Sequence, residues 1–149
     1  MATDVGAVPG PAVPDNDVRD EVTDLLVRYA TGIDSRNWSL LRSCFTEDCD
    51  ADYGDIGHWQ SADELTAWMS QTHDPLGPTL HRITNITVEG TSQGARARCY
   101  VHGIITLPDR SAVHAFGYYD DELVLRPEGW KIAARRFTSV STELHPPMS

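Results

Sequence analysis

The sequence predicts an α+β fold in which helices from the first half of the chain pack against an antiparallel sheet formed by the second half. Apolar residues recur at helical spacing up to about residue 73, and from residue 81 onward the pattern changes to that of strands. Three turn signals separate these strands, at Glu89-Gly90, Pro108-Asp109 and Pro127-Glu128-Gly129. Helices followed by consecutive long strands are typical of the α+β class.

Length, composition and charge are those of one globular domain. The chain has 149 residues, 40% of them hydrophobic and 23% charged, and this length can bury a sizeable core. Its formal net charge of -10 disfavours nucleic acid and anionic membranes as partners, because both are bound through a basic face. No apolar run is long enough for a membrane span or a signal sequence. Cys44, Cys49 and Cys99 lack paired metal spacing, so we expect reduced cysteines in a cytoplasmic protein.

The first helix is the longest one predicted. It follows an N-terminal tail at residues 1–16 that is rich in proline, glycine and small residues, and its N-cap is expected within residues 15–17. Gly32 could distort or end this helix just before Asp34. The apolar stripe of the helix consists of Val18, Val22, Leu25, Leu26, Tyr29 and Ile33.

Two shorter helices and a short strand precede the main sheet. The second helix carries its apolar residues between Trp38 and Phe45, and the short strand includes Ala51 and Tyr53. The run 61–64 matches a capping box that starts the third helix. Four long strands are then expected at about residues 81–88, 95–107, 114–125 and 130–141, so that the domain spans 17–141 and residues 142–149 form a C-terminal tail.

Asp34 stands where the first helix meets the second. A carboxylate there is mildly unfavourable, because the last turn of a helix carries unpaired carbonyls and the negative end of the dipole. Asp34 could cap the second helix, although Ser35 and Asn37 could do so equally well. It could also be a buried functional carboxylate. The local pattern leaves both interpretations open.

Three histidines, His81, His102 and His114, lie on predicted strands, where a single histidine is more often a structural residue than a catalyst. His114 shares its strand face with Phe116 and Tyr118. The histidines show no metal-binding spacing, and the chain has no glycine-rich nucleotide loop and no G-x-S-x-G elbow. Neither a metal nor a cofactor is therefore expected.

Several runs, taken in order, resemble the SnoaL-like domain of the nuclear-transport-factor-2-like superfamily, and in particular scytalone dehydratase and bile acid 7α-dehydratase. The resemblance covers about residues 17–141 and implies a cone-shaped α+β barrel, in which a strongly bent antiparallel sheet wraps the long first helix and encloses an apolar pocket. The matching segments are Tyr29–Cys44, Asp52-Tyr53, Pro78–Asn85, His114–Tyr119 and Gly129–Ile132.

The resemblance also implies roles for individual residues. Asp34 stands where scytalone dehydratase, bile acid 7α-dehydratase and hexachlorocyclohexane dehydrochlorinase have a catalytic Asp, and His81 stands where they have the His that pairs with it. Tyr29 matches a catalytic Tyr of the bile acid enzyme. Tyr53 and His114 match pocket residues of scytalone dehydratase. These five residues form the candidate catalytic set, with no metal-binding or cofactor-binding residues beside them.

The activity implied by the resemblance is that of a cofactor-independent lyase, a dehydratase acting on a small cyclic or polyketide-like compound of secondary metabolism. A polyketide cyclase or isomerase would use the same His/Asp pair, and the protein would form a homodimer or homotrimer. Ile33 replaces a second Tyr of scytalone dehydratase, so the same substrate is not expected. A non-catalytic binding module is the alternative from another class. An epoxide hydrolase would need several carboxylates around a water, and only one candidate acid is evident.

These roles make a geometric prediction. Asp34 and His81 should lie within hydrogen-bonding distance, or one water apart, and line a single internal pocket. Tyr29, Tyr53 and His114 should point into that pocket, whereas His58, His73 and His145 should not.

Overall fold

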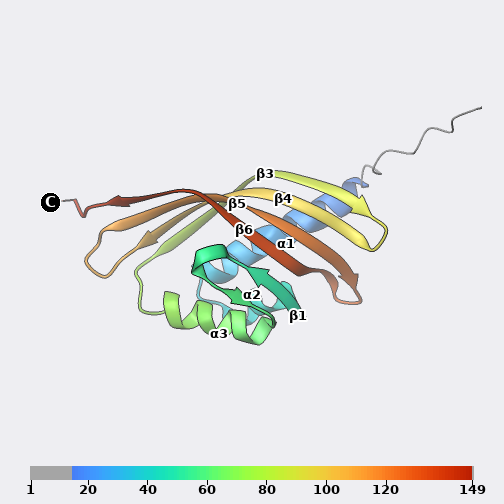
Figure 1. Cartoon of the computed structure of the whole chain (residues 1–149), viewed down its shortest axis with the longest axis horizontal. Coiled ribbons are helices and arrows are strands. Elements are labelled where there is room, and N and C mark those ends of the chain that lie inside the picture. The colour runs from blue at the N-terminus through green and yellow to red at the C-terminus, as the bar shows by residue number, and fades with distance from the viewer. Residues whose placement is uncertain (1–14, 149) are drawn as a thin grey trace, which may run out of the picture.

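The structure is a computed structural model that describes residues 15–148, so nearly all of the N-terminal tail predicted at residues 1–16 lies outside the described residues. Three α-helices, a short 3-10 helix and six strands form the fold (Figure 1). Their order is α1 (Asn16–Asp34), α2 (Trp38–Ser43), β1 (Phe45–Asp52), η1 (Gly54–Ile56), β2 (His58–Trp59), α3 (Ala62–His73), β3 (Thr79–Thr91), β4 (Gly94–Thr106), β5 (Ala112–Arg126) and β6 (Gly129–His145).

Helix α1 lies along the bent sheet and provides one side of the core (Figure 1). Asp15 caps it by accepting a hydrogen bond from the backbone N–H of Asp17. Gly32 does not end the helix, which continues to Asp34. A Cβ at this position would lie 2.9 Å from the backbone nitrogen of Leu41. The glycine therefore permits the close approach of α2. The fully buried residues of the stripe are Val22, Leu25, Leu26, Tyr29 and Ile33.

The sheet has the order β2-β1-β6-β5-β4-β3 and is not closed. All neighbouring strands are antiparallel except β1 and β6, which are parallel, with Phe45 opposite Ile132 and Asp50 opposite Ala134. The sheet is thus mixed, whereas the sequence led us to expect an antiparallel one. Most of the chain lies between β1 and β6, so no hairpin fixes their relative direction.

The long strands lie where they were predicted, within a few residues at each end. The main difference is at the end of the chain, where β6 continues to His145. Residues 142–145 pair with residues 112–115 of β5 and so belong to the sheet. The predicted C-terminal tail therefore contributes its first half to a strand.

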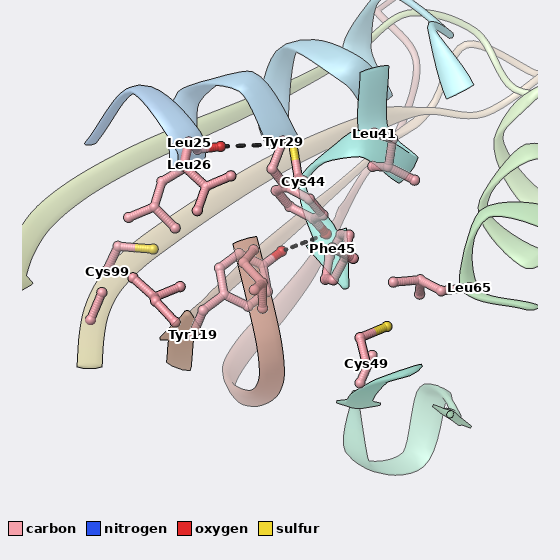
Figure 2. Packing of buried hydrophobic residues seen from close by; sticks show 14 of the residues in the cluster. Leu25, Leu26, Tyr29, Leu41, Cys44, Phe45, Cys49, Leu65, Cys99 and Tyr119 are labelled. Carbon is pink, nitrogen blue, oxygen red and sulfur yellow. Dashed lines mark hydrogen bonds between the residues drawn. The ribbon is translucent and has the colours of Figure 1, made fainter. Parts of the chain in front are cut away.

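The core lies between α1, α2, α3 and the inner face of the sheet, and Figure 2 shows part of its packing. Tyr29 of α1 and Tyr119 of β5 point toward one another there. All three cysteines are buried free thiols, and burial raises the pKa of Cys49 and of Cys99 to about 11. Among residues 15–148, no helix is long and apolar enough to cross a membrane.

Candidate active site

Asp34 and His81 form a hydrogen-bonded pair between the end of α1 and the start of β3. Oδ1 of Asp34 lies 2.7 Å from Nδ1 of His81, and Oδ2 accepts a hydrogen bond of 2.7 Å from the His81 backbone N–H. An ionised carboxylate only accepts hydrogen bonds, so this contact assigns the ring proton of His81 to Nδ1. In the neutral form of this ring the other nitrogen, Nε2, is then an acceptor, and no described residue donates a hydrogen bond to it.

Further contacts fix the Asp34 carboxylate in this position. Thr79 Oγ1 donates to Oδ1 of Asp34 at 3.0 Å, and Arg36 donates to Thr79 Oγ1 at 2.9 Å and to the carbonyl of Gly77 at 2.8 Å. Burial raises the pKa of Asp34, but the hydrogen bonds from the side chain and backbone of His81, and from Thr79, outweigh it and hold the pKa below its usual value. Asp34 is therefore ionised at neutral pH.

The structure decides between the two interpretations that the sequence left open for Asp34. The N-cap of α2 is Asn37, whose side chain accepts a hydrogen bond of 3.1 Å from the backbone N–H of Leu40. Asp34 makes no capping hydrogen bond to α2, and both of its carboxylate oxygens are turned to β3. Its position at a helix end, unfavourable in itself, is offset by the three donors of Thr79 and His81.

His81 lines a small apolar cavity of about 130 Å³ between α1, α3 and the sheet. The side chain of His81 is 9% exposed and that of Asp34 is 21% exposed. The prediction that both residues line the pocket holds for His81 only, because Asp34 contacts Nδ1 of the imidazole and is not part of the lining. Nε2 of His81 lies 3.6 Å from the position that a Cβ on Gly103 would occupy, so the missing side chain at Gly103 leaves space beside this nitrogen. Aliphatic lining comes from Ile33, Ile56, Met69, Val101, Ile105 and Ala115.

Three tyrosine hydroxyls meet at the cavity. Tyr29 OH lies 2.9 Å from Tyr53 OH and 3.4 Å from Tyr119 OH, and all three residues line the cavity. Burial raises the pKa of each phenol well above its usual value, although the positive charge of Arg135 acts in the opposite direction. The phenols therefore keep their protons at neutral pH and can donate hydrogen bonds.

A buried ion pair supports this tyrosine cluster. Arg135 donates two hydrogen bonds of 2.7 Å to the carboxylate of Asp121, and both side chains are almost fully buried. The guanidinium carbon of Arg135 lies 4.2 Å from the ring centre of Tyr29 and 3.9 Å from that of Tyr119. Cation–π contacts at this distance are attractive and favour the position of both rings against the guanidinium.

The structure brings together four of the five predicted site residues and excludes the fifth. His114 is absent from the cavity lining, and its Nδ1 lies 3.0 Å from Nε2 of His102 on the other face of the sheet. The prediction that His114 points into the cavity was wrong, because side chains alternate along β5 and Ala115 and Tyr119 occupy the inner face.

His73 lines the cavity although it was predicted to lie outside it. It was expected outside the pocket, but it is 8% exposed and lines the cavity, with its ring centre 6.4 Å from that of His81. The other two histidines expected outside, His58 and His145, are not in the lining.

Sequence reasoning missed Tyr119, His73 and Arg135. The signal for His73 was present, since it follows Leu65 and Met69 on the apolar face of α3 at four-residue spacing. The signal for Tyr119 was its position on the strand, because it lies an odd number of positions from His114 and the two side chains therefore lie on opposite faces. Nothing in the local sequence distinguishes Arg135 from its exposed neighbour Arg136.

A larger groove of about 640 Å³ lies elsewhere and is rich in charged side chains, Asp50, His58, Arg96 and Asp120 among them. Several of these pair with each other or with neighbours, as in Asp50–His58 and Arg98–Asp120. No group of three or more side chains within residues 15–148 is arranged to hold a metal ion. The small cavity with its histidine and tyrosines is therefore the better candidate site.

Comparison with family models finds a matching domain. The model of the SnoaL-like domain matches residues 16–136, which is most of the chain. The protein belongs to the SnoaL-like family. A relative of this domain, an uncharacterized protein of Mycobacterium tuberculosis, is 31% identical over 121 residues, which cover 78% of this chain and 82% of that protein.

Several proteins of known structure share this fold. A candidate aromatic ring hydroxylase from Novosphingobium aromaticivorans superimposes with a TM-score of 0.81 at 24% identity, covering 88% of this chain and 95% of that one. A candidate scytalone dehydratase from the same organism gives 0.79 at 20% identity, with 91% and 98% covered. A hexachlorocyclohexane dehydrochlorinase gives 0.80 at 18% identity, with 89% and 91% covered. At these identities the likeness establishes the fold.

Proposed function

We propose that this SnoaL-like protein is a cofactor-independent lyase, a dehydratase that removes water from a small cyclic compound. The observation that carries the proposal is the 2.7 Å contact between Asp34 and His81, which leaves Nε2 of His81 free beside an apolar cavity. A binding module has no need for this arrangement. The fold is shared with a candidate scytalone dehydratase and with a dehydrochlorinase. Both names denote enzymes that catalyse elimination, which supports the same chemistry here.

In the proposed reaction, Nε2 of His81 takes the acidic proton from a carbon next to a carbonyl group. The electron pair of the broken C–H bond forms the enolate, and Asp34 stabilises the imidazolium through Nδ1. The enolate then re-forms the carbonyl, the carbon–oxygen bond to the leaving hydroxyl breaks, and that oxygen receives the proton held on Nε2 of His81 and departs as water. His81 returns to its neutral state by giving up the proton that it took.

The tyrosine cluster suits the other half of this reaction. Tyr29, Tyr53 and Tyr119 keep their protons, so a hydroxyl from the cluster can donate a hydrogen bond to the carbonyl oxygen as negative charge develops there. Beside the apolar lining of this cavity, where the effective dielectric constant is lower than in water, such a donor stabilises charge more strongly than it would in solvent. Neither step calls for a cofactor.

The size of the cavity indicates the substrate class. Its volume of about 130 Å³ is slightly below the volume of about 150 Å³ at which an engineered apolar cavity holds benzene. We therefore expect a substrate whose reacting part is a single six-membered ring carrying a ketone. A cyclase or isomerase acting on such a ring would use the same base and would differ in releasing no water.

Proton exchange into deuterium oxide tests this proposal without knowledge of the natural substrate. Wild-type protein should catalyse exchange of the protons next to the carbonyl of cyclohexanone, followed by nuclear magnetic resonance, and should convert β-hydroxycyclohexanone to cyclohexenone. Exchange without loss of water would favour the isomerase or cyclase. A cyclohexanone that binds but does not exchange would contradict the assignment of His81 as a base.

Gly103→Ala provides a test of the space beside His81. The added methyl group would lie 3.6 Å from Nε2 and Cδ2 of His81 and 4.0 Å from the carbonyl of Ala115, which are ordinary contacts that the fold tolerates. It would occupy the position through which a C–H bond must approach, and small misplacements of a reacting carbon lower rates by about 100-fold. We expect exchange to fall on that scale with an unchanged melting temperature. Unchanged exchange would mean that the substrate reaches Nε2 by another path.

A further inference from the structure

His73 is a second histidine whose side chain lines the same cavity. Its Nδ1 lies 2.9 Å from the carbonyl oxygen of Met69, which can only accept a hydrogen bond, so Nδ1 carries the ring proton. The nearby hydroxyl of Thr72, at 3.0 Å, donates its own proton to the carbonyl of Trp68 and can accept from Nδ1 as well. No described residue makes a hydrogen bond to Nε2 of His73.

The surroundings keep this ring in place and neutral. His73 stands at the end of α3, with its ring centre 6.1 Å from that of Trp38 and 6.4 Å from that of Trp68. Burial lowers the pKa of His73 below its usual value, and the nearby His81 and Arg36 act in the same direction, although the hydrogen bond with Met69 and the negative charge of Asp34 partly offset them. A neutral ring with its proton on Nδ1 offers one acceptor at Nε2 and no donor.

This protonation state separates the roles of the two histidines. His81 has a carboxylate behind its Nδ1, which stabilises the positive charge formed when Nε2 takes a proton. His73 has an uncharged carbonyl in the same place, so it is the poorer base and remains a hydrogen-bond acceptor. It also has no proton on Nε2 to give to a leaving hydroxyl.

We propose that Nε2 of His73 binds a ring hydroxyl group that the substrate retains, so that the protein selects single-ring hydroxylated compounds over their deoxy counterparts. The proposal rests on the proposed function in taking the cavity of His81 as the substrate site. The distance of 6.4 Å between the two imidazole centres lets one ring contact both histidines. A substrate without the hydroxyl would leave Nε2 of His73 unpaired in this apolar cavity, which also works against its binding.

Phenol and toluene are suitable probes, since they have the same shape and differ in one hydroxyl group. We expect phenol to bind more tightly than toluene to the wild-type protein. His73→Phe, which retains a ring between the two tryptophans, should lower the ratio of the two affinities about fivefold, the value of one net hydrogen bond of about 1 kcal/mol. His73→Gln places an acceptor near the position of Nε2 and should restore much of the ratio.

Nitrogen chemical shifts of the histidine rings provide the direct readout. The His73 signals, assigned by their absence in His73→Phe, should show a neutral ring with its proton on Nδ1 at pH 7. Phenol should shift its Nε2 signal in the wild type and in His81→Ala, and toluene should not. Absence of phenol binding, a charged His73, or an affinity ratio unchanged in His73→Phe would overturn the proposal. Failure of proton exchange would remove the proposed function alone, because this binding assay does not depend on turnover.

Discussion

His81→Ala is expected to lower turnover about 100-fold or more, the usual effect of losing a general base, while the protein remains folded. The imidazole lies at the wall of a cavity and makes one side-chain hydrogen bond, to Asp34. Its removal leaves the backbone N–H of residue 81 still bonded to Oδ2 of Asp34. The measurement is exchange and dehydration of the cyclohexanone probes, together with circular dichroism and the melting temperature.

The partner variant Asp34→Asn should also reduce turnover severely, and the two losses should not add, because both residues serve one proton transfer. The amide group would turn its NH₂ toward either the ring or the backbone N–H of His81, so one donor loses its acceptor. We expect a loss of about 1 kcal/mol in the free energy of unfolding for that reason. Activity must therefore be expressed per folded molecule.

His114→Ala is the matched control for this experiment. The residue was a candidate from sequence, but it lies on the opposite face of the sheet beside His102. Its replacement should leave exchange at the wild-type level. A loss in His114→Ala as large as that in His81→Ala would mean that the outer face, rather than the cavity, carries the activity. Additive losses in the Asp34/His81 double variant would instead contradict the joint role of that pair.

The contrast between His81 and His114 shows what this sequence could and could not predict. Helical and strand periodicity placed the long elements correctly, because each buries one continuous face. The pairing of Asp34 with His81 came from resemblance, since 47 positions separate them in the chain and no local rule brings a helix end to a strand. Periodicity groups His114 with Phe116 and Tyr118, but it does not say which face of β5 is the inner one.

The remaining misses have a similar physical origin. His73 lies on the apolar face of α3, and a histidine in such a position is interpreted from sequence as a core residue. Only the structure shows that it lines a cavity. The parallel pairing of β1 with β6 depends on how distant segments pack. Arg135 is buried opposite Asp121 across β5 and β6, and a register of this kind follows from the assembled sheet.

This buried pair leads to the largest stability effect that we expect. Asp121→Asn keeps the size of the side chain and removes its charge, leaving Arg135 as a buried cation against the rings of Tyr29 and Tyr119. Removing one partner of a buried ion pair lowers the free energy of unfolding by about 3–5 kcal/mol. The amide oxygen of the new Asn can still accept one hydrogen bond from Arg135, so we expect a loss near the lower end of this range. That is a large fraction of the total stability of a typical domain, about 5–15 kcal/mol. Urea unfolding monitored by circular dichroism measures it.

The adjacent residue supplies the control. Asp120 also makes a doubly hydrogen-bonded pair, with Arg98, but that pair is exposed to solvent on the other face of β5. Water and salt screen such a pair, so Asp120→Asn should change the unfolding midpoint far less than Asp121→Asn does. Replacing both Asp121 and Arg135 by apolar residues, Leu and Met, should recover much of the lost stability, because no unpaired charge remains buried. Similar midpoints for Asp120→Asn and Asp121→Asn would show that water reaches Arg135, and the tyrosine cluster would then be a wet site rather than a dry one.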